Sequence, residues 1–324
     1  MKRIVLFTAA ALVLATTALY YAAPALFQQP LLQLNRQLSG LAAHTTRING
    51  HEVHYLDSSA APAGGRLPVI LLHGIFAEKD HWADFARPLT ATHRVVVPDL
   101  PGFGESTRDE ALPYDYAAHV ARLVALMDAW GIEKAHLAGN SMGGTIAALL
   151  AREHPERVAS VAFIGAPHGL RSPRPSRMDQ LIDAGQRPLV APDAAAFEAM
   201  MALVFEKRPF LPYPILHATE QAAARNAASN TRLWDAQLKD RYLLGQRLAG
   251  LQQPALALWG EQDRVFDISG TQALAALLPQ ARIEPLPGIG HLPMMEAPAD
   301  TAQRYLAFLQ QTAPQGPDQR AARP

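Results

Sequence analysis

Leu137-Ala138-Gly139-Asn140-Ser141-Met142-Gly143-Gly144 is the stretch that decides the fold of this chain. It contains the pattern Gly-x-Ser-x-Gly, which is a nucleophile elbow when a strand precedes it and a helix follows it. Residues 135–138 are typical of a short buried strand, and residues 145–152 are typical of a helix. The stretch therefore indicates a strand–turn–helix unit; an ordinary glycine-rich loop or a phosphate-binding turn is the alternative.

The residue types in this motif have a chemical reason. The serine has to lie on a sharp, strained turn that pushes its hydroxyl into a cleft, and side chains at Gly139 or Gly143 would collide with the strand or the helix. The helix that begins at Ser141 directs its N-terminal N–H groups toward the reacting centre. The motif predicts Ser141 as a nucleophile and the N–H of Met142 as one donor of an oxyanion hole.

Composition narrows the class of protein. The chain has 324 residues, of which 49% are hydrophobic, a formal net charge of zero and no cysteine. This length suits one large domain or a domain with an inserted subdomain. The balanced charge gives no indication of nucleic-acid binding. The lack of cysteine excludes disulfides, zinc thiolates and a cysteine nucleophile. We expect no metal and no cofactor.

The N-terminus is apolar over the length of a bilayer. Met1-Lys2-Arg3 precedes an uncharged run that lasts until Arg36, and residues 4–23 would form a helix of about 30 Å, just enough to span hydrocarbon. We expect residues 1–29 to be an uncleaved signal anchor. A cleaved signal peptide with a small-x-small site at 23–25 is one alternative, and a buried soluble helix is another. The protein would be membrane-anchored, with the side of the membrane undecided, or exported.

Strands and helices alternate around the elbow. A hairpin turning at Asn49-Gly50 is expected first. Apolar runs of strand length follow at 69–72, 94–99, 158–164, 255–259 and 282–285, with a helix at 116–130. This alternation predicts an α/β fold with a mostly parallel sheet and helices on both faces.

The alternation breaks in the middle of the chain. Residues 171–250 carry seven prolines, and Met and Phe residues recur there at helical spacing. We expect a helical cap over the carboxyl edge of the sheet, including a helix at 233–248. The expected domain order is a first core segment at 30–169, a cap at 170–252, a second core segment at 253–311 and a flexible tail at 312–324.

The second half of the chain supplies partners for the serine. A serine hydroxyl needs a base, and the base needs an orienting carboxylate. Asp263 lies in a turn after one strand and His291 lies between glycine-rich turns after the next, in the order Ser…Asp…His that this architecture requires. Asp267 is the alternative acid, and a structural histidine is the alternative for His291. Asp99 and His73 are expected to be structural.

Together these segments resemble the α/β-hydrolase superfamily over residues 46–311. The motifs that carry the resemblance are His73-Gly74, Asp99-Leu100-Pro101-Gly102-Phe103-Gly104-Glu105-Ser106, the elbow, Trp259-Gly260-Glu261-Gln262-Asp263 and Gly290-His291. Within the superfamily, the run from His73 to Trp82, the Asn-Ser-Met elbow and the apolar N-terminus are similar to membrane-anchored monoacylglycerol lipases and related bacterial lipases.

The resemblance implies an activity and one further site residue. The substrate would be a carboxylic ester of lipid type, a monoacylglycerol or a similar acyl ester, cleaved through an acyl-enzyme. Ile75, the residue after His-Gly, would be the second oxyanion donor beside Met142, with Phe76 as the neighbouring alternative. The acyl-chain preference and the oligomeric state stay open.

Other functions fit parts of the pattern. Carbon–carbon bond hydrolases of ring-cleavage products share the Asn-Ser-Met-Gly-Gly elbow, but they usually carry a Gly-Pro-Gly-like extension after His-Gly that is missing here. Cofactor-free haloperoxidases share the triad. A non-catalytic binder on a hydrolase scaffold is a further alternative, although such proteins commonly lose a triad member. Serine at position 141 argues against dehalogenases and epoxide hydrolases, whose nucleophile is aspartate.

Overall fold

An eight-stranded sheet forms the centre of the molecule, in the strand order β1-β2-β4-β3-β5-β6-β7-β8. The computed structural model describes residues 2–59 and 65–312, except for the side chains of residues 2–8, 10 and 11. The strands are β1 (Ala42–Ile48), β2 (His51–Asp57), β3 (Val69–Leu72), β4 (Val95–Pro98), β5 (Ala135–Ser141), β6 (Val158–Pro167), β7 (Ala255–Gly260) and β8 (Arg282–Leu286).

The sheet has a parallel part and an antiparallel edge. Strands β3 to β8 pair in parallel, whereas β1 pairs with β2, and β2 with β4, in the antiparallel sense. The antiparallel edge begins with the predicted hairpin, in which Asn49 and Gly50 have φ of 47° and 81°. Two successive positive φ angles are what a two-residue type I′ turn requires. The expected mostly parallel sheet is confirmed.

Helices cover both faces of the sheet, which explains the unbroken apolar run of β3. Ile70 and Leu72 lie in one hydrophobic cluster with α4 and α5, while Val69 and Leu71 lie in the other with α3 and α13. Residues that alternate along a strand point to opposite faces, so both sets are buried. The core helices are α3 (Ala83–Ala86), α4 (Tyr116–Ala129), α5 (Met142–Glu153), α11 (Gly270–Leu277), α12 (Pro293–Glu296) and α13 (Pro298–Thr312), with 3₁₀ turns at Lys79–Trp82 and Pro155–Arg157.

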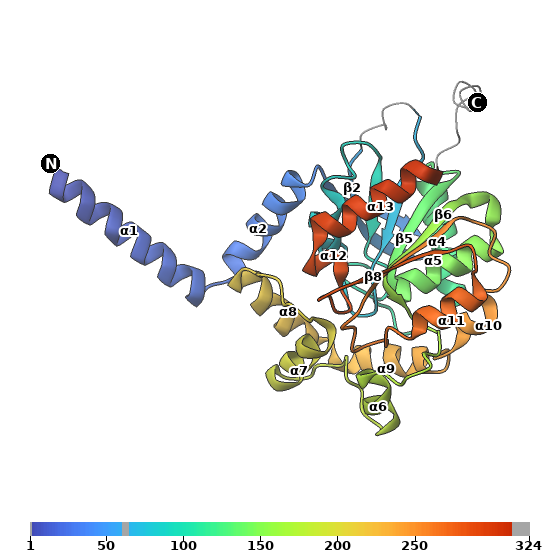
Figure 1. Ribbon diagram of the computed structural model, residues 1–324. Coiled ribbons are helices and arrows are strands. Elements are labelled where there is room, and N and C mark those ends of the chain that lie inside the picture. Colours follow the sequence, from blue (N-terminus) through green and yellow to red (C-terminus); the bar gives the residue numbers. More distant parts are fainter. Residues whose placement is uncertain (1, 60–64, 313–324) are drawn as a thin grey trace.

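A helical segment lies between β6 and β7. It consists of α6 (Arg177–Asp183), α7 (Ala194–Val204), α8 (Tyr213–Arg225), α9 (Ala227–Leu238) and α10 (Leu243–Arg247), and Figure 1 shows these helices gathered at one end of the sheet. The single helix expected at 233–248 is wrong. The chain turns at 239–242, where Arg241 pairs with Asp179 and Asp183, and this turn separates α9 from α10.

Two helices precede the sheet. Helix α1 (Lys2–Ala22) extends away from the rest of the chain, and α2 (Ala25–Leu38) lies beside α8 (Figure 1). The expected boundary after residue 29 falls inside α2. Within the described part of the chain, no helix combines the length and the apolar character needed to cross a membrane. The expectation of a membrane-spanning anchor is therefore not supported; part of it concerns side chains at 1–8, 10 and 11, which lie outside the described part.

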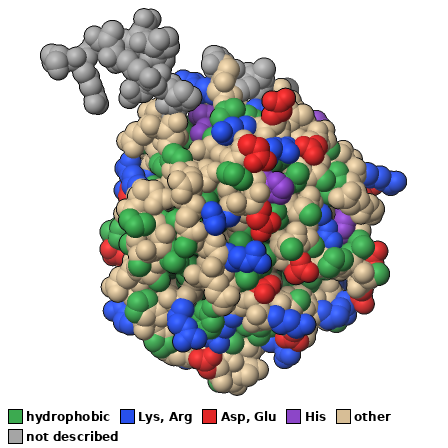
Figure 2. Space-filling model, turned by 90° about the vertical axis from the view of Figure 1, so that its right-hand side faces the viewer, with side chains coloured by type: hydrophobic (Ala, Val, Ile, Leu, Met, Phe, Trp, Pro, Cys, Tyr) green, Lys and Arg blue, Asp and Glu red, His purple; other side chains and the backbone are tan. Residues whose placement is uncertain are grey.

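Charge is mixed over the surface. Figure 2 shows one face, on which acidic and basic side chains alternate and no patch of one sign dominates. This pattern agrees with 29 basic residues against 29 acidic ones.

Candidate active site

The nucleophile elbow has the strained geometry that its sequence predicts. Ser141 ends β5 and precedes α5, with φ of 51° and ψ of −118°. A non-glycine residue held at positive φ costs on the order of 1–3 kcal/mol. A Cβ atom at Gly143 would come within 2.2 Å of the Leu72 carbonyl oxygen, and one at Gly139 within 2.3 Å of the Gly143 carbonyl carbon. Both glycines are therefore sterically required.

His291 and Asp263 lie in contact. Nδ1 of His291 donates to Oδ2 of Asp263 at 2.8 Å, and both side chains are buried. The other carboxylate oxygen of Asp263 accepts the N–H groups of Val265 and Phe266 at 2.8 and 2.9 Å. Because Nδ1 carries the proton in this pair, Nε2 of a neutral His291 ring is an acceptor.

The alternative acid lies elsewhere. Oδ1 of Asp267 accepts the N–H of Ser269 at 2.8 Å and Nε of Arg174 at 3.2 Å. The structure brings Asp263, and not Asp267, to the imidazole of His291.

The loop that follows β3 packs on the serine. A Cβ atom at Gly74 would come within 3.2 Å of the Ser141 Cβ, so the loop backbone approaches the elbow closely. Ile75 and Ser141 line the same two cavities, and Phe76 has a φ of 59°. Met142 is buried at the start of α5. Ile75 thus belongs to the loop that packs on the serine, and Met142 follows the serine directly in the chain.

His73 supports this loop, as expected. Burial lowers the pKa of His73, so its ring is neutral. The N–H of Leu100 donates to Nε2 at 2.9 Å, which leaves Nδ1 to donate to the Gly74 carbonyl at 2.7 Å. These two bonds tie the loop that contains Ile75 to the loop after β4.

Asp99 is structural as well. Its carboxylate accepts the N–H and Nζ of Lys79, each at 2.7 Å, and the N–H of Glu105 at 2.9 Å. Burial alone would lower the pKa of Lys79, but Asp99 and Asp80 raise it above its usual value. Asp80 also forms a bidentate ion pair with Arg36 at 2.6 and 2.7 Å, which fastens α2 to the core.

A large cavity of about 440 Å³ opens on the serine and the histidine. Its lining is mostly apolar and includes Leu31 and Leu34 of α2, Met200 and Met201 of α7, and Ile215 of α8, together with Ser141 and His291. Pockets of 300–1,000 Å³ with a few polar groups are typical of small-molecule sites.

Three carboxyl groups also line this cavity, those of Glu78, Asp80 and Asp84. Burial, reinforced by the negative charges of Asp99 and Asp80, raises the pKa of Glu78 to about 8. Glu78 is therefore protonated and uncharged at neutral pH, which keeps the cavity wall free of a charge at that position.

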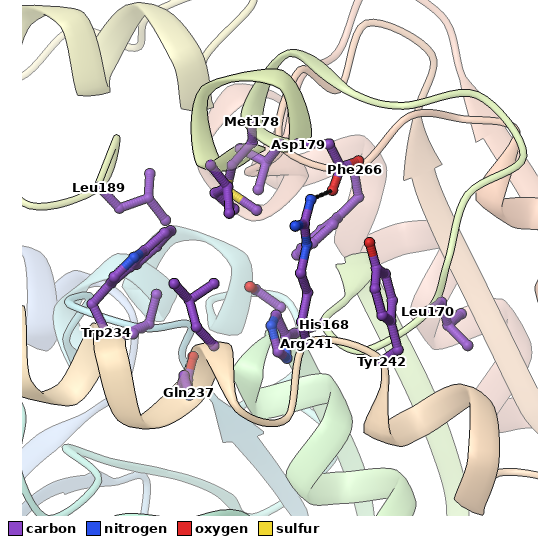
Figure 3. Close-up of a pocket in the computed structure, with 15 residues that line it drawn as sticks. His168, Leu170, Met178, Asp179, Leu189, Trp234, Gln237, Arg241, Tyr242 and Phe266 are labelled. Atoms are coloured by element: carbon purple, nitrogen blue, oxygen red, sulfur yellow. Dashed lines mark hydrogen bonds and ion pairs between the residues drawn. The ribbon is translucent and has the colours of Figure 1, made fainter. Parts of the chain in front are cut away.

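A second, small cavity of about 20 Å³ also reaches Ser141. Figure 3 shows it between α6, which carries Met178 and Asp179, and α9, which carries Trp234 and Gln237. His168 and Arg241 lie in it as well. The sequence analysis missed this cavity, because its lining comes from segments without a recognisable motif.

No group of three or more His, Asp or Glu side chains that could hold a metal ion occurs among residues 2–59 and 65–312. The arrangement provides a serine on a strained turn, a buried histidine hydrogen-bonded to a carboxylate, and a large, mostly apolar cavity that Ser141 and His291 both line.

Comparison with known proteins identifies the family. The model of the alpha/beta hydrolase fold family matches residues 68–298, more than half of the chain. The chain belongs to the α/β-hydrolase family. This α/β hydrolase is an enzyme, a carboxylic ester hydrolase.

Several of its relatives are lipases. It is 28% identical to Lipase 3 of Moraxella sp. (strain TA144), over 86% of this chain and 88% of that lipase. It is 30% identical to the monoacylglycerol lipase abhd6-A of Xenopus laevis, over 78% of each chain. A solved structure described as a membrane phospholipase A, a novel bacterial virulence factor, is 35% identical, with a TM-score of 0.85 over 96% of this α/β hydrolase and 99% of that chain.

Proposed function

We propose that the protein is a serine hydrolase that cleaves acyl esters of lipid type, such as a monoacylglycerol, through an acyl-enzyme. The observation that carries the proposal is the large apolar cavity that opens on Ser141 and His291. An acyl chain in this cavity places its carbonyl carbon at the serine. The lipase and monoacylglycerol lipase relatives support the substrate class.

The proposed reaction has two halves. Nε2 of His291 takes the proton of the Ser141 hydroxyl as the oxygen attacks the ester carbonyl, and Asp263 holds the imidazole in the required tautomer. The N–H groups of Met142 and Ile75 stabilise the negative charge that develops on the carbonyl oxygen. His291 then protonates the departing alcohol. In the second half, water activated by His291 attacks the acyl-enzyme and releases the acid.

Residues 170–252 act as the cap in this proposal. The backbone N–H of His291 donates to the carbonyl of Val204 in α7 at 2.9 Å. Glu296 accepts the N–H groups of Gly290, Glu206 and Lys207. These bonds fasten the cap to the loop that contains His291, so they hold the cavity wall in position relative to the base.

Filling part of the large cavity with a bulkier side chain tests the acyl-binding role. We expect Ile215→Trp to lower the ratio of kcat/KM for dodecanoyl over butanoyl p-nitrophenyl ester by about tenfold or more, because the larger side chain competes with the distal methylenes. Ile268→Trp is the matched control, since Ile268 lines neither cavity. An unchanged ratio in Ile215→Trp would place the acyl chain elsewhere.

We also propose that the mouth of the large cavity works at a lipid surface. Leu34 and Leu38 of α2 and Phe210 of the α7–α8 loop line the cavity and are exposed to solvent, Phe210 by 89%. Exposed apolar residues around a pocket mark a lipid or protein interaction site. Helices α1 and α2 would hold this face at a membrane, so that an acyl chain passes directly into the cavity. The membrane phospholipase A of similar structure supports this proposal.

Sedimentation with lipid vesicles tests the membrane proposal. The full chain should pellet with vesicles after a high-salt wash, because apolar insertion is insensitive to ionic strength. A chain that lacks residues 1–23, cut before α2, should pellet less and still hydrolyse short soluble esters. A full chain that stays in the supernatant would contradict the proposal.

A further inference from the structure

The small cavity, which Ser141 lines, is also lined by a residue with an unused hydrogen-bond donor, Arg241. Arg241 lies in the turn after α9 and reaches Asp179 and Asp183 of α6, each at 2.7 Å, through its two terminal nitrogens. Its Nε atom is buried and has no hydrogen-bond partner among the residues that the structure describes. A buried donor without a partner costs free energy, so a site of this kind favours a ligand oxygen.

A second polar group lines the same cavity. Nδ1 of His168 shares a hydrogen bond of 2.8 Å with the hydroxyl of Tyr116, and the two rings stack. Burial and the charge of Arg241 lower the pKa of His168 to about 4, so the ring is neutral at physiological pH. With Nδ1 engaged, Nε2 is the nitrogen left for a ligand.

The two cavities divide the space around Ser141. The large one suits the acyl chain, which leaves the small one, also lined by Ser141 and Ile75, for the alcohol part of the ester. About 20 Å³ is room for one water-sized group. We infer that the small cavity binds a free hydroxyl group of the alcohol, as in a glycerol monoester, with Arg241 as its donor and His168 as its second partner. This inference rests on the proposed function.

Charge favours a neutral hydroxyl over a phosphoryl group. The guanidinium of Arg241 is already paired with two carboxylates, so the three side chains carry a net negative charge. An incoming phosphate would be repelled by Asp179 and Asp183, whereas a hydroxyl needs only the N–H. The recognised substrate is therefore an ester whose alcohol keeps at least one free, uncharged hydroxyl.

Substrates with and without that hydroxyl test the inference. For the wild-type protein, kcat/KM for 1-monooctanoylglycerol should exceed that for propyl octanoate by about tenfold or more, the worth of a hydrogen bond from a charged donor. Arg241→Lys keeps the charge and loses the Nε–H, so the ratio of the two substrates should fall toward one. His168→Phe, which keeps the stacked ring and removes its nitrogens, should lower the same ratio.

The control is Arg171→Lys. The guanidinium carbons of Arg241 and Arg171 lie 5.3 and 4.3 Å from the centroid of the Tyr242 ring, but Arg171 does not line the small cavity. This variant should keep the wild-type ratio. A ratio near one in the wild type, or one unchanged in Arg241→Lys, would overturn the inference while esterase activity stands.

A third substrate distinguishes a cavity that binds a neutral hydroxyl from one that binds a phosphoryl group. If Arg241→Lys loses more activity on 1-octanoylglycerol-3-phosphate than on 1-monooctanoylglycerol, the cavity binds a phosphoryl group and the inference is wrong. If the wild type hydrolyses none of the octanoyl esters, the proposed function fails and this inference fails with it.

Discussion

Replacing Ser141 by alanine is expected to lower kcat for p-nitrophenyl octanoate by about 10⁵-fold or more, as removal of a nucleophile does in serine proteases. The alanine side chain has no atom that can attack the carbonyl, and the rest of the site stays in place. Ser141 is buried at the elbow, so the smaller side chain leaves the packing almost intact.

Two measurements test this prediction together: kcat for the hydrolysis of p-nitrophenyl octanoate and a thermal melt of the variant. The melt should show a folded variant with Tm unchanged or raised, because the substitution leaves Gly139 and Gly143 and their close backbone approaches in place. Ser172→Ala, outside both cavities, is the matched control and should keep wild-type turnover. Appreciable activity in folded Ser141→Ala would mean that another residue is the nucleophile.

Asp263→Asn should be the second most damaging single change. The amide would hold His291 in the wrong tautomer, which in a serine protease costs about 10⁴-fold in kcat. The amide nitrogen also cannot accept the N–H groups of Val265 and Phe266 if it occupies the position of Oδ1. We expect a loss of about 10³–10⁴-fold in kcat with little change in KM.

Asp267→Asn is the comparison that makes the acid assignment testable. Asp267 contacts Ser269 and Arg174 but not His291, so its replacement should change kcat by less than about threefold, within the range of mutations away from the chemistry. Steady-state kinetics of both variants on the same ester shows which carboxylate orients His291. Equal losses, or a larger loss in Asp267→Asn, would show that the wrong carboxylate was chosen.

The elements that the sequence predicted are those determined by local chemistry. The elbow at Gly139–Gly143 follows from steric limits between neighbouring residues, and the turn at Asn49-Gly50 follows from their tolerance of positive φ. Strand β3 could be predicted because a strand covered by helices on both faces has a short, unbroken apolar sequence. Asp263 was preferred over Asp267 because it lies in the turn that follows a strand, and in the structure it contacts His291.

The elements that the sequence did not predict depend on contacts between distant residues. The break between α9 and α10 coincides with ion pairs from Arg241 to Asp179 and Asp183, about 60 positions earlier, and no local pattern marks it. The bidentate pair of Arg36 with Asp80 likewise joins an N-terminal helix to the core. Such pairings leave no periodic pattern in the sequence. Both cavities are likewise lined by residues from distant segments, so only the folded chain shows them.

Intact-protein mass spectrometry during turnover tests the central claim most directly. The wild-type protein, mixed with p-nitrophenyl octanoate and quenched in acid within the first turnovers, should carry one octanoyl group, and peptide analysis should place it on Ser141. Ser141→Ala should carry none. A wild-type protein that hydrolyses the ester without ever carrying an acyl group, or that carries it on another residue, would contradict the serine mechanism proposed here.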